Sequence, residues 1–350
     1  MTPEPRYIPK QVIWELTLQC NLHCIHCGSS AGIPRSHELT LQESRNIIND
    51  LACIHTDQVC LMGGEPFLKK EWYQIAKAIK DAGMKLLFIS NGYQITSDTL
   101  KKLIALEPYA ISTSLDGATP TTHDHIRGVK GSYHNVLKFI THLTTAGLPT
   151  TVITTVNKLN FTELPDIKNL LLNKHIAWQI QTAAPEGRFK KKFALSKEEF
   201  YTVGLFIAAL RNRYTPKELP VIGAHCFGYH SQHIPYLGLS PHWTGCQAGL
   251  SILSIKSNGD ITGCLSTPAT YIEGNIRKKR LIDIWNDPEA FAYNRKFTPK
   301  DLDDHCKECE FGRTCKGGCL GMSTSFTTKP HNDPYCFHTI ELQYQDKQLG

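Results

Sequence analysis

Residues 12–53 read VIWELTLQCNLHCIHCGSSAGIPRSHELTLQESRNIINDLAC and contain a strand, a cysteine-rich loop and a helix, in that order. The short apolar run over 12–18 predicts a strand. Thr40 and Glu43 have the spacing of a capping box, and the apolar residues after them recur on one face of a helix over 41–53. The segment therefore predicts one β/α unit with closely spaced cysteines just beyond the end of its strand.

The same alternation of strand and helix continues to about residue 212. Further strands are predicted at 57–62, 85–90, 110–115, 150–156 and 176–181, and further helices at about 71–82, 97–106, 132–146, 162–173 and 197–212. Six such units are typical of a parallel α/β sheet. They predict a partial (β/α)6 barrel, two units short of a complete eight-unit barrel, although a doubly wound sheet has the same local signature.

The rest of the chain has a different character. Residues 213–240 are rich in His, Pro, Gly and Tyr, which is typical of a linker. Asn258-Gly259 between apolar residues predicts a β-hairpin, and a helix is predicted at about 281–294. We therefore expect four parts: a barrel over 1–212, the linker 213–240, a small cysteine-rich domain with the β-hairpin over 241–340, and a tail over 341–350.

The composition is that of an ordinary folded protein, apart from its thirteen cysteines. The chain of 350 residues is 41% hydrophobic and 20% charged, which excludes a disordered or collagen-like protein. It shows no signal-peptide pattern and no membrane-spanning stretch, so we expect a cytoplasmic protein without membrane contact. Clustered cysteines in that compartment indicate metal or redox chemistry rather than disulfides. The net charge of +6 forms no strong basic patch, and we expect no nucleic-acid partner.

The first cysteine motif is Cys20-x3-Cys24-x2-Cys27. Three thiolates at this spacing in a loop can converge on one metal centre. A structural zinc site is normally closed by four protein ligands, and His23 or His26 is available as the fourth. Three thiolates on a [4Fe–4S] cluster instead leave one iron open to another molecule. The spacing by itself leaves both alternatives open.

The motif resembles the CxxxCxΦC signature of the radical S-adenosylmethionine (SAM) superfamily. In that family the three cysteines hold a [4Fe–4S] cluster, and the amine and carboxylate of SAM chelate the open iron. His26 stands where the family usually has an aromatic residue, and its flat ring is expected near the adenine.

A second motif, Gly63-Gly64-Glu65-Pro66, follows the second predicted strand. Glycines let a backbone approach a ligand closely, and a carboxylate can accept hydrogen bonds from an ammonium group. The resemblance implies that this motif binds the methionyl amine of SAM and that Arg127 pairs with the methionyl carboxylate. Further SAM contacts are implied for Ser90, Asn91, Ser112, Ser114, Asp116 and Asn157. These residues follow predicted strands, at the edge where β/α barrels place their active sites.

Seven cysteines near the C-terminus form a further pattern, Cys246-x12-Gly259-x4-Cys264, Cys306-x2-Cys309-x5-Cys315-x3-Cys319 and Cys336. The string resembles the SPASM extension of radical SAM enzymes, which implies two auxiliary [4Fe–4S] clusters. The resemblance assigns one cluster to Cys306, Cys309, Cys315 and Cys336, and the other to Cys246, Cys264 and Cys319. The fourth ligand of the latter is left open among Cys226, His242, another nearby residue and an open iron. Cys53 and Cys60 are expected to be buried structural thiols.

The resemblance implies reductive cleavage of SAM to a 5′-deoxyadenosyl radical that abstracts hydrogen from a substrate. Relatives with two auxiliary clusters most often modify ribosomally made peptides, so the leading hypothesis is a peptide maturase that forms a cross-link or an oxidised side chain. A small-molecule enzyme of cofactor, tetrapyrrole or sugar modification and a zinc scaffold are the alternatives. Expected partners are a peptide or protein substrate, a separate leader-binding protein, and flavodoxin or ferredoxin as electron donor. No catalytic acid or base is named; Asp116, Gln181 and Arg188 are candidate cavity residues.

Overall fold

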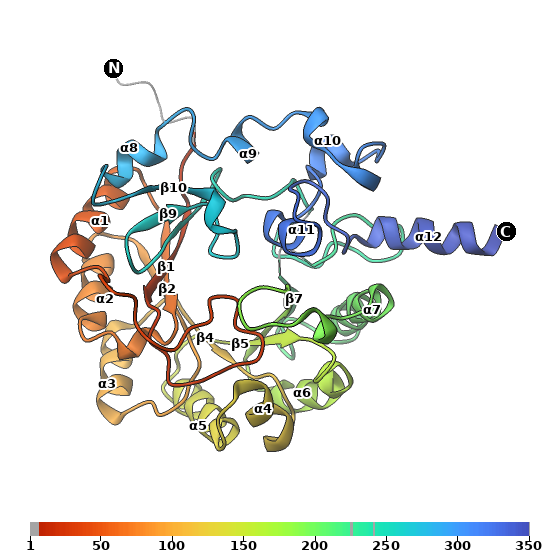
Figure 1. Cartoon of the computed structure of the whole chain (residues 1–350). Coiled ribbons are helices and arrows are strands. Elements are labelled where there is room, and N and C mark those ends of the chain that lie inside the picture. Colours follow the sequence, from red (N-terminus) through yellow and green to blue (C-terminus); the bar gives the residue numbers. More distant parts are fainter. Residues whose placement is uncertain (1–6, 225–226, 241, 350) are drawn as a thin grey trace.

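The framework of the protein is a ten-stranded sheet, seen in a computed structural model that describes residues 7–224, 227–240 and 242–349 (Figure 1). The strand order is β10-β9-β8-β1-β2-β3-β4-β5-β6-β7. The six strands predicted first lie side by side in sequence order, and all of their pairings are parallel. They are β1 Gln11–Thr17, β2 Gln58–Gly63, β3 Lys85–Ser90, β4 Ala110–Ser114, β5 Thr150–Val156 and β6 Ala177–Thr182.

The consecutive strand order decides between the two predicted architectures. A doubly wound sheet reverses its strand order at a switch point, and no such reversal occurs between β1 and β6. The helices lie outside the curved sheet (Figure 1). The partial (β/α)6 barrel is thus confirmed, with the predicted helices at α1 Leu41–Cys53, α2 Trp72–Asp81, α3 Ser97–Leu106, α5 Ser132–Thr145, α6 Leu164–Leu171 and α7 Lys197–Arg213.

Alternation along the strands separates the core from the interior of the barrel. Trp14 and Trp178 are buried in the two large apolar clusters between sheet and helices. Their neighbours Ile13 and Gln179 point to the opposite face, because successive side chains of a strand alternate. Ser112 and Ser114 of β4 and Gln179 and Gln181 of β6 therefore face the concave interior, where a ligand of the barrel has to lie.

One helix of the barrel was not predicted. The helix α4 Pro120–Arg127 lies between β4 and α5, after a Thr119 cap and a proline in its first turn. It ends at Gly128, whose φ of 72° suits glycine. The helix was missed because it is short. It places Arg127 at a helix end rather than in a loop.

The C-terminal part extends the barrel sheet. Residues 213–240, expected to be a linker, contain β7 Val221–Gly223, which pairs with β6. The hairpin prediction is confirmed by β8 Ile252–Ile255 and β9 Asp260–Thr262, and β8 pairs in parallel with β1. The strand β10 and the short helices α10 and α11 occupy Ile272–Asn275, Gly312–Cys315 and Leu320–Thr327.

Two expectations about the C-terminal helices are corrected. The single helix predicted over 281–294 is two short helices, α8 Leu281–Trp285 and α9 Ala292–Arg295, because Pro288 lies between them and cannot continue a helix. The predicted boundary at residue 340 falls inside α12 Phe337–Leu349. Over the described ranges, none of the helices has the length and apolar character needed to span a bilayer.

Candidate active site

The loop with the first three cysteines is fixed to the end of α4. The backbone N–H groups of His23 and Ile25 donate to the carbonyl oxygens of Arg127 and Ile126, at 3.1 and 2.8 Å. A Cβ atom at Gly128 would lie 2.5 Å from the carbonyl oxygen of His23, so the loop and the helix end approach closely only because glycine is there. The helix thereby holds the cysteine loop beside the carboxyl ends of the strands.

Hydrogen-bond donors point at each of the three thiols. The backbone N–H of Leu22 lies 3.5 Å from Cys20 Sγ, and that of Ala31 lies 3.4 Å from Cys27 Sγ. The guanidinium of Arg127 lies 3.7 Å from Cys24 Sγ. Burial raises the pKa of Cys20 to about 11 and also raises the pKa of Cys24. One buried and two half-buried thiols with N–H donors aimed at their sulfur atoms fit a site in which a bound metal centre holds them as thiolates.

The Gly63-Gly64-Glu65-Pro66 motif brings a buried carboxyl group to the same edge. A Cβ at Gly64 would lie 2.1 Å from the carbonyl oxygen of Gln19, so the motif packs directly against the strand that carries the cysteine loop. Glu65 accepts hydrogen bonds from Ser90 Oγ at 2.9 Å and from the backbone N–H of Asn91 at 2.8 Å. Burial raises the pKa of Glu65 to about 7. Pro66 starts a short 3-10 turn after the motif.

The side chain of Asn91 links β3 to the cysteine loop. Its Nδ2 donates to Asn21 Oδ1 at 2.8 Å and lies 3.7 Å from Cys20 Sγ. Its Oδ1 accepts the N–H of Tyr93. The predicted residues Glu65, Ser90 and Asn91 are therefore brought together at the first cysteine.

A second buried carboxylate, Asp116, organises the opposite side. Its Oδ2 lies 2.6 Å from Arg127 Nη2 and 3.3 Å from His26 Nε2, and its Oδ1 accepts the N–H of Thr155 at 2.8 Å. Burial lowers the pKa of His26 to about 4, so this imidazole is neutral. Arg127 Nε and His26 Nδ1 are buried and have no hydrogen-bond partner within the described part of the chain. A guanidinium N–H and an imidazole nitrogen without partners fit a site that a polar cofactor occupies.

The remaining predicted contacts divide into two groups. Ser112 and Ser114 are half-buried on the interior face of β4, next to this network. The side chain of Asn157 is instead engaged within its own turn, where Nδ2 donates to Thr155 O at 3.2 Å and Oδ1 accepts the N–H of Leu159 at 2.9 Å. Asn157 thus shapes the end of β5 in this structure.

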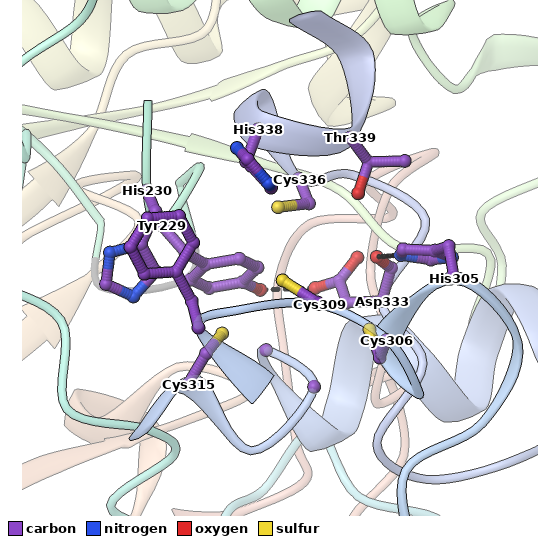
Figure 2. Close-up of a pocket in the computed structure, with 13 residues that line it drawn as sticks. Tyr229, His230, His305, Cys306, Cys309, Cys315, Asp333, Cys336, His338 and Thr339 are labelled. Atoms are coloured by element: carbon purple, nitrogen blue, oxygen red, sulfur yellow. Dashed lines mark hydrogen bonds between the residues drawn. The ribbon is translucent and has the colours of Figure 1, made fainter. Parts of the chain in front are cut away.

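Four of the C-terminal cysteines line one cavity, shown in Figure 2. They are Cys306, Cys309, Cys315 and Cys336. His230 forms part of the wall and stacks on Phe311, with ring centroids 4.2 Å apart. The grouping predicted for the fully ligated auxiliary cluster is therefore present in space.

Cys246, Cys264 and Cys319 gather at a second place. Burial raises the pKa of Cys246 to about 11 and that of Cys264 to about 12, and the neighbouring Cys319 thiol is the next cause for both. His242 is exposed and acts electrostatically on His230, which lines the other cavity. Cys226 lies outside the described residues.

Two expectations about the remaining cysteines have different outcomes. Cys60 is buried as expected, whereas Cys53 is exposed, because it ends α1 beyond the helix face that packs on the sheet. Among the described residues, no set of three or more His, Cys, Asp or Glu side chains is arranged to bind a single metal ion.

Two family models match the chain in agreement with this geometry. The model of the Radical SAM superfamily matches residues 14–171, and the SPASM model, an iron–sulfur cluster-binding domain, matches residues 246–310. Residues 14–171 belong to the radical SAM superfamily, and residues 246–310 form a SPASM domain. Its cofactors are accordingly SAM and [4Fe–4S] clusters, which confirms the iron–sulfur interpretation of the cysteines.

Relatives of two kinds match this radical SAM protein along most of its length. The AdoMet-dependent heme synthase of Methanosarcina barkeri is 28% identical over 344 residues, which cover 94% of this chain and 97% of that protein. The mycofactocin maturase MftC of Mycolicibacterium smegmatis is 26% identical over 333 residues, which cover 94% of this chain and 82% of MftC.

Solved structures share the fold. SuiB of Streptococcus suis bound to S-adenosylmethionine has a TM-score of 0.76 at 17% identity, with 94% of this chain and 77% of SuiB covered. The anSMEcpe protein bound to AdoMet and the Cp18Cys peptide has a TM-score of 0.68 at 15% identity, with 97% of this chain and 99% of that chain covered. The radical SAM barrel and the SPASM extension are thus joined in the arrangement of these enzymes.

The structure gives Arg188 a role that sequence reasoning missed. Its Nε donates to the carbonyl oxygen of Cys24 at 2.9 Å, its Nη1 to that of Ala31 at 2.7 Å, and its backbone N–H to that of Cys27 at 3.0 Å. A Cβ at Gly187 would lie 2.4 Å from the Cys27 oxygen. In the radical SAM protein, Arg188 clamps the cluster loop; the Gly-Arg step after β6 was the signal available in the sequence.

A carboxyl group that the sequence did not single out lies in the same loop. Glu186 is half-buried, and its side chain reaches within 3.9 Å of where a Cβ at Gly28 would stand. Ser325 of α11 donates to it, and burial raises its pKa. Glu186 therefore connects the loop of the first three cysteines to the SPASM part of the chain.

Proposed function

We propose that this radical SAM enzyme is a peptide maturase, which removes hydrogen from a ribosomally made peptide or protein and leaves a cross-link or an oxidised side chain. The observation that carries the proposal is the chemical character of the barrel interior. The described residues of β4, β5 and β6 line it with neutral hydrogen-bonding groups.

The interior faces of β4, β5 and β6 present hydroxyl and amide groups. Ser112, Ser114, Thr151 and Gln179 are half-buried there, and Gln181 Nε2 donates to Thr155 Oγ1 at 3.0 Å. Amides and hydroxyls donate and accept hydrogen bonds without charge. A peptide backbone and neutral side chains are complemented by such a wall.

Four cationic side chains near the interior already have partners. Arg35 lies 3.0 Å from Glu15, and Lys69 donates to the carbonyl oxygen of Leu39 at 2.9 Å. Arg127 is paired with Asp116, and Arg188 with backbone carbonyls. A substrate with several carboxylates needs cations that are free to pair with it. This occupancy favours a peptide over a polyanionic small molecule.

The residues divide the work of binding. We assign Cys20, Cys24 and Cys27 to the SAM-binding cluster, which together with SAM supplies one-electron reductive cleavage to a 5′-deoxyadenosyl radical. Glu65 offers a buried carboxyl group to the methionyl ammonium, and Arg127 Nε is available to its carboxylate. The buried Asp116 holds Arg127 and His26 in place.

Glu186 is our candidate for handling a proton of the substrate. It lies between the cluster loop and α11, and burial raises its pKa above that of an exposed glutamate. A carboxyl group with a raised pKa exchanges protons more readily near neutral pH.

Cys306, Cys309, Cys315 and Cys336 are assigned to one auxiliary cluster, and Cys246, Cys264 and Cys319 to the other. Partners proposed are flavodoxin or ferredoxin as electron donor and a separate leader-binding protein.

The second candidate is modification of a tetrapyrrole. It is favoured by one observation, the match to the AdoMet-dependent heme synthase of Methanosarcina barkeri along 97% of that protein. A Fe-coproporphyrin III synthase of the same organism is also 26% identical over 358 residues. We place this candidate second because the cationic side chains named above are already paired and are not free to bind the carboxylates of a tetrapyrrole.

Anaerobic incubation with reductant and SAM separates the two candidates. One arm contains a peptide encoded beside the gene and the other contains Fe-coproporphyrin III. We expect 5′-deoxyadenosine together with a mass change of the peptide. 5′-Deoxyadenosine with an altered porphyrin and an unchanged peptide would instead establish the second candidate. Cys24→Ala is the inactive control, and Cys53→Ala, at an exposed cysteine, is its matched counterpart.

A further inference from the structure

A buried tyrosine hydroxyl reaches the place where Cys246, Cys264 and Cys319 gather. Tyr293 belongs to α9, and its ring packs edge-on against Tyr271, with centroids 5.1 Å apart and planes at 86°. A Cβ atom built on Gly263 would stand 2.1 Å from the Tyr293 hydroxyl oxygen. The hydroxyl therefore lies against the residue that precedes Cys264, and only glycine leaves room for it.

The surroundings of this hydroxyl come from both cysteine segments. The same position at Gly263 is 2.9 Å from Ala248 Cβ, two residues after Cys246. A tyrosine hydroxyl ordinarily has a pKa of about 10 and carries its proton at neutral pH. The O–H group is thus a hydrogen-bond donor placed beside the segments of both cysteines.

This donor has no partner among the described residues, although it is buried. Of the polar groups beside it, Asn294 Nδ2 donates to the carbonyl oxygens of Cys246 and Ala248 at 2.6 and 2.8 Å, and the N–H of Gly249 donates to Ile252 O, whereas Asn294 Oδ1 is itself buried without a partner among the described residues. Buried hydroxyl groups almost always have a hydrogen-bond partner, because leaving one unpaired is costly. A group that occupies the space between these cysteines would supply a partner for Tyr293.

We propose that the Tyr293 hydroxyl donates a hydrogen bond to a sulfur atom of the auxiliary [4Fe–4S] cluster held by Cys246, Cys264 and Cys319. Tyr293 is then a positioning residue that raises the reduction potential of that cluster, because a donor at sulfur stabilises the more negative, reduced state. The inference rests on the proposed assignment of these three cysteines to a cluster and is independent of the peptide substrate.

Tyr293→Phe tests the proposal, since it removes the oxygen atom and keeps the ring against Tyr271. The reconstituted protein is titrated with reductant under EPR detection, and iron and sulfide are counted per chain. We expect the iron content of the wild type, a more negative midpoint potential for one cluster only, and loss of one exchangeable-proton coupling from the spectrum of that reduced cluster. Tyr271→Phe, on the neighbouring ring, is the matched control and should leave potential and coupling unchanged.

Cys264→Ala separates the failure of this proposal from the failure of the cluster assignment, because alanine cannot bind iron. If Cys264→Ala keeps the full iron content, the three cysteines hold no cluster and the proposal for Tyr293 is overturned as well. If Cys264→Ala loses one cluster while Tyr293→Phe keeps both the potentials and the proton coupling of the wild type, the role of Tyr293 alone is overturned. Loss of one cluster in Tyr293→Phe, with unchanged thermal unfolding of the iron-free protein, supports the contact.

Discussion

Arg188 binds the backbone of Cys24, with its Nε 2.9 Å from the carbonyl oxygen, although 164 residues separate them in the sequence. The same side chain also holds the carbonyl oxygen of Ala31. One residue after β6 therefore fixes the loop that follows β1. The two ends of the partial barrel are tied together at the point where the family binds its SAM cluster.

Replacing Arg188 by lysine should loosen this loop, because one ammonium group lacks the planar fork that reaches two carbonyl oxygens at once. We expect the SAM-responsive cluster to lose iron to a chelator about 10-fold faster or more, as is typical for residues that support metal ligands. Lys190→Ala, an exposed position of the same basic run, is the control. Equal rates of iron loss in Arg188→Lys and the wild type would show that the loop does not depend on the clamp.

Gly64→Ala should disrupt the SAM site by steric conflict. A Cβ there meets the carbonyl oxygen of Gln19 at 2.1 Å and that of Leu18 at 2.7 Å, and these backbone atoms leave little room to relax. We expect the free energy of unfolding to fall by about 1–3 kcal/mol and SAM to bind more weakly. Calorimetry measures both effects. Gly32→Ala is the matched control, because a Cβ at Gly32 meets nothing within 4 Å. Similar SAM affinities of the two variants contradict the prediction.

The stability of the SAM-free protein should depend on pH through Glu65. Its pKa is raised by burial from the ordinary value of 4.5 to about 7, so between these values the native state holds a proton that the unfolded state has released. Stability therefore falls as pH rises from 4.5 to 7, by about 3 kcal/mol for this group. We expect the Tm of the wild type to fall relative to that of Glu65→Gln as the pH is raised from 4.5 to 7.5. A difference that is constant with pH would be incompatible with a raised pKa.

Glu186→Gln should separate substrate modification from SAM cleavage. The variant keeps the shape of the side chain and its contact to Ser325 but cannot exchange a proton. We expect formation of modified substrate to fall about 100-fold or more, with 5′-deoxyadenosine production retained. Mass spectrometry of product and nucleoside from the same reaction measures both. Glu289→Gln, at an exposed glutamate, is the control, and an unimpaired product yield in Glu186→Gln would remove Glu186 from the mechanism.

Local patterns predicted the barrel well because its elements are defined by local physics. The capping box of Thr40 and Glu43 and the alternation in β1 act over a few residues, and both are present as predicted. The short helix α4 escaped because its eight residues carry a weak periodic signal. At Pro288 the error was the opposite one. A single helix was predicted across this proline, although a proline cannot continue a helix.

The sequence motifs, together with the family that they resemble, determined that this protein carries iron–sulfur chemistry, and the alternation of strands and helices determined a parallel α/β sheet. Both are properties of neighbours in the chain. Only the tertiary structure decided that Arg188 clamps the Cys24 loop, that Asp116 joins His26 to Arg127, and that the Tyr293 hydroxyl lies against Gly263, next to Cys264. These contacts connect segments that are distant in the sequence. Their strength comes from burial and from the close approach of particular atoms, and the spacing of residues along the chain determines neither.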